Sequence, residues 1–198
     1  MMYSQRDEEK FILRFFREVK GRFLDIGAYD GKCFSTTHAL ALKGWSGVCV
    51  EPSPSVLPAL KNLYKDNPAI EIWPIAISEV SGKRKFYDSG GDAISSFDED
   101  HVKLWKDKGA KNFTEIEVVS QTIQEFFDYI VSPPFDFINI DAEGLSLYIL
   151  KNLPYSLLDK TKMICVEFDH KEKEVNEILH QYGFNLLHRT AENLILVR

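Results

Sequence analysis

The chain has 198 residues, of which 44% are hydrophobic, and its 24 basic and 30 acidic residues give a formal net charge of -6. This length and apolar content fit one compact domain, so residues 1–198 are interpreted as a single domain. The acidic balance argues against nucleic-acid binding through phosphates, which depends on clustered lysine and arginine.

The first half of the chain alternates predicted strands and helices. Residues 6–20 carry apolar side chains at helical spacing, which predicts a helix within an N-terminal segment, residues 1–21. Continuous apolar strands that alternate with helices are typical of a parallel sheet covered by helices on both faces. The predicted strands cover residues 22–26, 47–51 and 70–77, and the helices between them cover 32–43 and 55–65.

The second half continues this pattern after an irregular middle. Residues 88–112 contain glycines and many charges, and a loop this long in a compact domain is usually functional or mobile. We therefore interpret residues 88–112 as a candidate lid over a substrate. The remaining predicted elements are strands over 83–87, 114–119, 135–140 (introduced by Pro133 and Pro134) and 163–168, helices over 122–129, 145–152 and up to about Gln181, and a terminal hairpin of 184–188 and 194–197.

The turn after the first predicted strand carries the strongest functional signal. In Phe23-Leu24-Asp25-Ile26-Gly27-Ala28-Tyr29-Asp30-Gly31, glycines between a strand and a helix let a ligand approach the backbone closely. Glu51 ends the next strand, at the spacing where an acidic residue accepts hydrogen bonds from ribose hydroxyls. Ligands of open α/β sheets lie at these carboxyl ends, so a nucleoside cofactor is predicted here.

The composition of this turn favours one nucleoside cofactor over another. NAD calls for G-x-G-x-x-G, whose middle glycine opens a helix N-terminus to a pyrophosphate, but Tyr29 occupies that position and Asp30 adds negative charge. S-adenosyl-L-methionine has no phosphate and carries a sulfonium cation, so a turn containing Asp25 and Asp30 suits it better. A nicotinamide-dependent oxidoreductase and a non-catalytic nucleoside-binding module remain as alternatives.

Four segments, residues 23–31, 44–52, 76–78 and 137–144, together resemble the FkbM family of methyltransferases, within a match over about 23–169. The resemblance implies a Rossmann-like seven-stranded methyltransferase sheet with an antiparallel last strand, in agreement with the predicted hairpin. It also implies O-methylation, often of sugars or natural-product hydroxyls. The predicted cofactor-binding residues are Asp25, Gly27, Ala28, Tyr29, Gly31, Glu51 and Pro52, joined through the resemblance by Ala76, Ile77 and Ser78 near the adenine.

The sequence departs from the family pattern at two places. The family usually has Asn where this chain has Tyr29, so the cofactor pocket is expected to differ there. It often has an acidic residue two positions after the Gly-Leu that follows the Asp-x-Glu-Gly motif. Here Ser146 and Leu147 follow Gly144-Leu145, and no role for such an acid is predicted.

Polar side chains at the ends of two later strands are the catalytic candidates. Asp141 and Glu143 follow one strand and His170 follows the next. His170 could remove the proton of a hydroxyl acceptor at neutral pH, whereas Asp141 or Glu143 would need a raised pKa or a metal to do so. The structural alternatives are support of the cofactor turn by Asp141, a helix cap at Glu143 and a surface position for His170. Asp141, Glu167 or Asp169 would also suit a divalent metal, but no metal site is predicted.

The expected partner is a small-molecule or glycan acceptor. Phe97, His101 and Trp105 of the candidate lid would offer a sugar a contact surface, or would only anchor the loop. Three separated cysteines without metal spacing indicate a reducing compartment, and no apolar run spans a bilayer or forms a secretory signal. A cytoplasmic protein is therefore expected, and its oligomeric state is not predicted.

Overall fold

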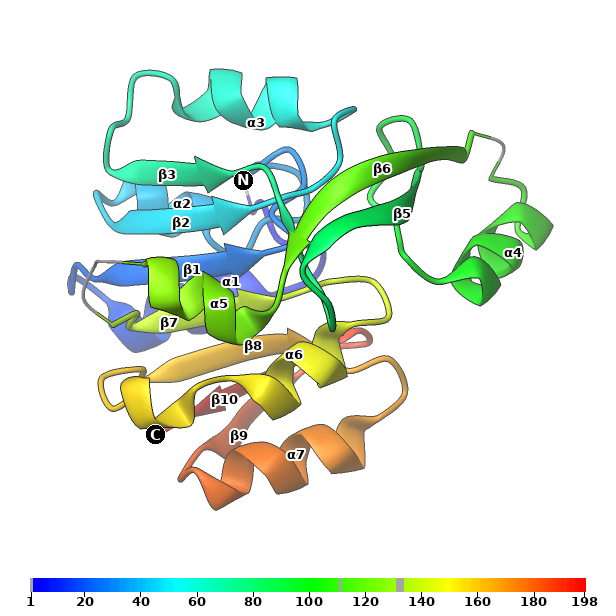
Figure 1. Ribbon diagram of the computed structural model, residues 1–198. Coiled ribbons are helices and arrows are strands. Elements are labelled where there is room, and N and C mark those ends of the chain that lie inside the picture. The colour runs from blue at the N-terminus through cyan, green and yellow to red at the C-terminus, as the bar shows by residue number, and fades with distance from the viewer. Residues whose placement is uncertain (1, 111, 131–133) are drawn as a thin grey trace.

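The structure is a computed structural model that describes residues 2–110, 112–130 and 134–198 (Figure 1). Lys111 of the candidate lid and Pro133 before a predicted strand lie outside the described residues. The strands form a seven-stranded sheet, in the order β3-β2-β1-β7-β8-β10-β9, and a separate three-stranded sheet, in the order β4-β6-β5.

The seven-stranded sheet has the predicted topology. Its strands are β1 (Arg22–Ile26), β2 (Ser46–Val50), β3 (Ile70–Trp73), β7 (Phe137–Ile140), β8 (Met163–Glu167), β9 (Asn185–Arg189) and β10 (Asn193–Val197). The first five of these pair in parallel, whereas β10 runs antiparallel to both β8 and β9, which confirms the terminal hairpin. The strand order reverses between β1 and β7, which is where open α/β sheets bind their ligands.

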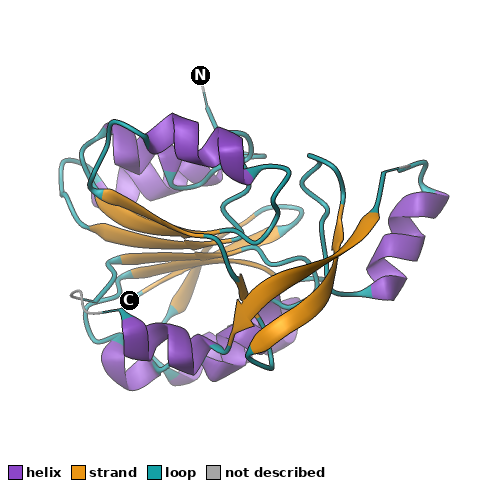
Figure 2. Cartoon of the chain, turned by 45° about the horizontal axis from the view of Figure 1, so that its top comes forward, coloured by secondary structure: helices purple, strands orange, loops and turns teal. Residues whose placement is uncertain are grey.

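Helices cover both faces of this sheet, as expected for buried parallel strands (Figure 2). Phe23 and Phe137 turn toward one face, where they pack with Phe16 and Trp45, and Leu24 and Ile138 turn toward the other. Alternate residues of each strand thus feed two separate layers of core. The first face carries α1 (Glu8–Phe16), α2 (His38–Leu42) and α3 (Leu57–Tyr64), and the second carries α5 (Ile123–Tyr129), α6 (Ser146–Asn152) and α7 (Glu172–Gln181), with a 3-10 turn, η1 (Tyr155–Leu157), after α6.

Residues 70–77 do not form the single strand predicted for them. Pro74 follows β3, and because proline has no amide hydrogen it cannot continue the ladder of hydrogen bonds. The chain therefore leaves the main sheet, and β4 (Ala76–Ile77) pairs with β6 (Thr114–Gln121) instead. β6 also pairs with β5 (Gly82–Asp88), so both short strands predicted in this region are confirmed.

The candidate lid contains a helix that the sequence analysis missed, α4 (Glu99–Asp107). The Asp98 side chain caps it by accepting the amide hydrogen of Asp100, and two acidic residues occupy its first turn. Only Val102 of this helix is buried, so charged residues conceal its apolar spacing in the sequence. α4 stands apart from the two helical layers, next to the ends of β5 and β6 that lie farthest from the main sheet (Figure 1).

The helix predicted over residues 32–43 is shorter than expected, because α2 begins only at His38. The Asp30 side chain accepts the amide hydrogens of Lys32 and Cys33, which holds the chain in a turn before the helix. Cys49 and Cys165 are buried and free, as predicted, and Cys33 is free and exposed. Among the described residues, no helix combines the length and apolar character needed to cross a bilayer.

Candidate functional site

A cavity of about 790 Å³ lies at the carboxyl ends of β1, β2, β7 and β8, under the candidate lid. Two predicted cofactor residues, Gly31 and Ser78, do not line it. The fold therefore gathers most of the predicted site in one place, although the residues come from segments far apart in the sequence. The predicted residues in its wall are Asp25, Gly27, Ala28, Tyr29, Glu51, Pro52, Ala76, Ile77, Asp141, Glu143 and His170.

Gly27 makes the sharp turn after β1 possible. Its φ is +86°, in the left-handed region, and a Cβ added there would lie 1.7 Å from the carbonyl oxygen of Asp141. The amides of Gly27 and Ala28 both donate to the carbonyl oxygen of Val50, at 3.0 and 3.1 Å. These contacts fix the turn against the ends of β2 and β7, and so leave its outer side to the cavity.

Gly31 and Ser78 are held by local packing instead. A Cβ on Gly31 would lie 2.5 Å from Cδ1 of Leu60, so this glycine lets the turn pack against α3. The Ser78 hydroxyl is buried and donates to the carbonyl oxygen of Val80 at 3.0 Å. Both residues therefore stabilise segments next to the cavity without lining it.

Glu51 is a buried carboxylate that contacts the turn directly. One of its oxygens accepts the amide hydrogen of Tyr29 at 2.9 Å, and the other accepts that of Ser53 at 2.8 Å. Each oxygen keeps a second acceptor position. Burial raises the pKa of Glu51 to about 7, although the two backbone hydrogen bonds oppose the rise. Ligand hydroxyls that donate to Glu51 would favour its ionised form.

Both carboxylate oxygens of Asp25 already have hydrogen-bond partners within the protein. Its two oxygens accept hydrogen bonds from the Thr37 hydroxyl at 2.6 Å and from the Asn139 side-chain amide at 2.9 Å. Burial raises the pKa of Asp25, and these two hydrogen bonds oppose that rise. Asp25 thus ties β1 to β7 and to the start of α2, at the floor of the cavity.

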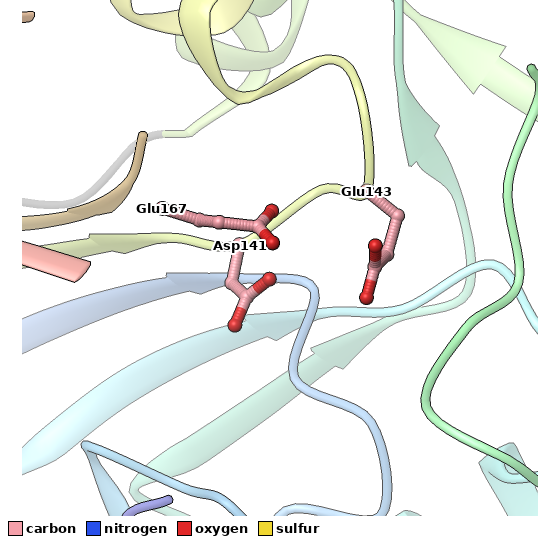
Figure 3. Close-up of side chains that lie close together, drawn as sticks. All are labelled: Asp141, Glu143 and Glu167. Atoms are coloured by element: carbon pink, nitrogen blue, oxygen red, sulfur yellow. The ribbon is translucent and has the colours of Figure 1, made fainter. Parts of the chain in front are cut away.

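Asp141, Glu143 and Glu167 form an acidic cluster at the ends of β7 and β8 (Figure 3). One oxygen from each lies within 4.8 Å of the others. Burial and the neighbouring carboxylates raise the pKa of Asp141 to about 6 and that of Glu143 to about 9, and they also raise the pKa of Glu167 well above its usual range. The cluster therefore favours protons or a cation in its midst, but its geometry alone assigns no metal ligand.

These raised pKa values predict that the ligand-free protein becomes less stable as the pH rises. Above their ordinary pKa values, Glu51, Asp141 and Glu143 bind more protons in the folded than in the unfolded state, so the stability they contribute is lost with rising pH. His38 and His101 act in the opposite sense, because burial lowers the pKa of each.

We expect the carboxylates to dominate, and the free energy of unfolding to fall by several kcal/mol from about pH 5 to about pH 9, since one extra bound proton is worth about 1.4 kcal/mol per pH unit. Urea denaturation across this range measures the effect. Stability that climbs steadily toward about pH 8 would contradict the predicted burial of these carboxylates.

The candidate lid contacts both sides of the cavity. The Tyr29 hydroxyl donates to the carbonyl oxygen of Gly91 at 2.5 Å, and the Ser96 hydroxyl donates to that of Glu143 at 2.9 Å. Phe97, His101 and Trp105, which were expected to contact a substrate, all line the cavity. The segment thus connects the turn at Gly27 to Tyr29 with the acidic cluster, a role that sequence spacing does not reveal.

The two histidines of the cavity differ in their surroundings. His170 is exposed and has a φ of 62°, so it lies at the rim. The side chain of His101 is only 14% exposed, and its Nε2 lies 3.6 Å from Oε2 of Glu143. Sequence reasoning ranked His170 as a proton acceptor and His101 only as a contact, because nothing in the sequence shows that His101 of α4 lies beside Glu143.

Residues 25–186 match a family model described as the methyltransferase FkbM domain. A comparison with curated proteins gave no match. Among solved structures, the chain is similar to an FkbM methyltransferase from Methylobacillus flagellatus KT, with 16% identity, a TM-score of 0.56, and coverage of 90% of this chain and 44% of that one. It is also similar to monomeric WbdD, with 14% identity, a TM-score of 0.55 and coverage of 98% and 41%.

A third structure, a ribosomal protein L11 methylase from Lactobacillus delbrueckii subsp. bulgaricus, is 15% identical, with a TM-score of 0.50 and coverage of 96% of this chain and 75% of that one. At these identities the three structures indicate a shared fold alone. The chain spans less than half the length of the WbdD and FkbM methyltransferase chains that it matches.

Proposed function

Because this chain belongs to the FkbM family of methyltransferases, we propose that it uses S-adenosylmethionine to methylate a hydroxyl oxygen of a sugar or glycoconjugate. In this proposal the turn at Gly27, Ala28 and Tyr29 surrounds the nucleoside, and Glu51 accepts hydrogen bonds from its ribose. The exposed free thiol of Cys33 supports a reducing, cytoplasmic setting.

The charge of the cavity is the observation that carries the choice of cofactor. Of the described residues that line it, Lys108 is the only lysine or arginine. A cavity wall in which acidic residues far outnumber basic ones attracts a sulfonium cation and repels the pyrophosphate of a dinucleotide. It therefore supports a methyltransferase over a nicotinamide-dependent oxidoreductase. The acidic residues of the wall are Asp25, Glu51, Asp92, Asp141, Glu143, Glu167, Asp169 and Glu192.

The lid side of the cavity supports a sugar as acceptor. Phe86, Phe97 and Trp105 line this side, together with the hydroxyls of Ser95 and Ser96. Aromatic faces pack well against the C–H faces of a sugar ring, and neighbouring polar groups then fix its orientation. A glycan or a small sugar conjugate combines both features.

The acidic cluster would prepare the acceptor for reaction. Bound S-adenosylmethionine supplies an electrophilic methyl group, and the acceptor oxygen must approach it in line while losing a proton. Asp141 and Glu143, whose pKa values are raised by burial to about 6 and about 9, are our candidates to hydrogen-bond the acceptor hydroxyl, with His170 at the rim. The walls of the cavity would keep water away from the methyl donor.

Two measurements test the proposal. Isothermal titration should give binding of S-adenosylhomocysteine and none of NADH, and transfer of a tritiated methyl group from S-adenosylmethionine should label pooled glycans. Binding of NADH in place of S-adenosylhomocysteine would support the oxidoreductase, and cofactor binding without turnover over a broad acceptor panel would support a non-catalytic module. The transfer assay with magnesium or with EDTA decides whether the acidic cluster uses a metal.

Tyr29→Phe should loosen the candidate lid while leaving the cofactor turn intact. The substitution removes the hydrogen bond to Gly91 but keeps the backbone contact with Glu51. A hydrogen bond of about 1 kcal/mol predicts about fivefold weaker methyl transfer, with faster hydrogen exchange in residues 88–110. Tyr129→Phe, at an exposed position in α5, is the matched control. Unchanged hydrogen exchange in Tyr29→Phe would show that the hydrogen bond from Tyr29 to Gly91 does not hold the candidate lid in place.

A further inference from the structure

His101 presents an unused nitrogen to the cavity. Its Nε2 is buried and finds no hydrogen-bond partner in the described part of the chain, and the residue lines the cavity wall. A buried polar atom without a partner is unfavourable, and such atoms in native proteins usually await a water or a ligand. Glu143, whose Oε2 lies 3.6 Å away, is the nearest acidic group and marks the direction in which this nitrogen faces.

The other ring nitrogen defines the tautomer of His101. The ring makes a backbone hydrogen bond with Ile94, and because Nε2 has no partner, Nδ1 is the nitrogen that donates to the Ile94 carbonyl. A neutral ring held in this way carries its hydrogen on Nδ1. The lone pair of Nε2 is then free on the cavity side, which is the arrangement that a proton acceptor requires.

We propose that Nε2 of His101 accepts the proton of the acceptor hydroxyl during methyl transfer, an inference that rests on the proposed function. The oxygen forms a bond to the methyl carbon while the carbon–sulfur bond breaks and its electron pair stays on sulfur. The electrons of the O–H bond remain on oxygen, and its proton moves to Nε2 and later to water. The products are a methyl ether and S-adenosylhomocysteine.

The charges around His101 suit this role. Burial lowers the pKa of His101, as does the charge of Lys108, whereas Asp98 and Asp169 raise it. The ring is therefore neutral before reaction, and the carboxylates of Asp98 and Asp169 stand near the imidazolium that forms. Since His101 lies on α4, the proton acceptor reaches the site only while the candidate lid is in place.

The test compares His101→Ala and His101→Gln with His180→Gln, a matched change at an exposed histidine of α7. Isothermal titration with S-adenosylhomocysteine and tritiated methyl transfer to the pooled glycans are measured for each variant. Both His101 variants should bind S-adenosylhomocysteine within about threefold of the wild type, while kcat falls about 100-fold or more. Free imidazole should restore part of the activity of His101→Ala.

The pH profile provides the readout that a structural role would not move. In the wild type, kcat/KM should rise with pH through the pKa of His101, and this limb should be missing in His101→Gln. Wild-type turnover with unchanged kcat in both His101 variants would overturn the inference and leave the proposed function standing. A wild type that fails to bind S-adenosylhomocysteine or to transfer methyl groups would overturn the proposed function itself.

Discussion

Gly27→Ala is expected to abolish cofactor binding and to lower the free energy of unfolding by at least about 4 kcal/mol. The new methyl group would overlap the carbonyl oxygen of Asp141, at 1.7 Å, and a left-handed φ of +86° costs an alanine about 1–2 kcal/mol more. The overlap involves backbone, so relief requires the ends of β1 and β7 to move apart. That movement would also displace the turn that we assign to the nucleoside.

Gly183→Ala separates the cost of the steric overlap at Gly27 from the cost of its left-handed φ. Gly183 has nearly the same φ, +82°, but a Cβ there meets nothing within 4 Å. This control should lose only the conformational cost of about 1–2 kcal/mol and should bind S-adenosylhomocysteine normally. Urea denaturation and isothermal titration measure both variants. Equal losses of stability at the two positions would show that the close approach of Gly27 to the Asp141 backbone does not contribute to the free energy of unfolding.

Glu51→Gln should weaken S-adenosylhomocysteine binding by about 100-fold, because hydrogen bonds to a charged carboxylate contribute about 1.5–3 kcal/mol each. The backbone N–H groups of Tyr29 and Ser53 now donate to the two oxygens of Glu51. In the variant, the side-chain NH2 would replace one of these oxygens, so that two donors would face each other. Glu177→Gln, on the outer side of α7, is the matched control. Binding within about threefold of the wild type in Glu51→Gln would exclude Glu51 as a ribose acceptor.

The pH dependence of binding gives a second view of Glu51. Since burial raises its pKa to about 7, the ligand-free protein holds this carboxyl partly protonated at neutral pH. A ligand that donates hydrogen bonds binds the ionised form, so affinity should rise by about tenfold from about pH 6 to about pH 8. The rise should be absent in Glu51→Gln. A fall in wild-type affinity over this range would contradict the assignment.

Local sequence signals correctly predicted the strands in which every residue is buried. The strands predicted over residues 22–26 and 135–140 contain the central strands β1 and β7, and the spacing from Gly27 to Glu51 placed both of these residues on one wall of the cavity. The break at Pro74 was missed because both sides of it are apolar. The helix of residues 99–107 was missed because it rests on a capping aspartate and few buried contacts.

The candidate site was predictable to the extent that it follows strand ends. Asp141, Glu143 and Glu167 meet because parallel strands end at one edge of a sheet. Gly31 and Ser78 fall outside the cavity because packing against Leu60 and a turn at Val80 engage them. His101 could not be placed from the sequence, because its position beside Glu143 depends on how the candidate lid packs against the cavity.

A crystal structure of the complex with S-adenosylhomocysteine would show whether the nucleoside lies between the turn at Gly27 and Glu51. We expect the ribose hydroxyls to donate to Glu51 beside this turn, and the sulfur to face the side of the cavity where His101 and Glu143 meet. A ligand bound elsewhere on the protein, or seated in this cavity with its ribose away from Glu51, would contradict it.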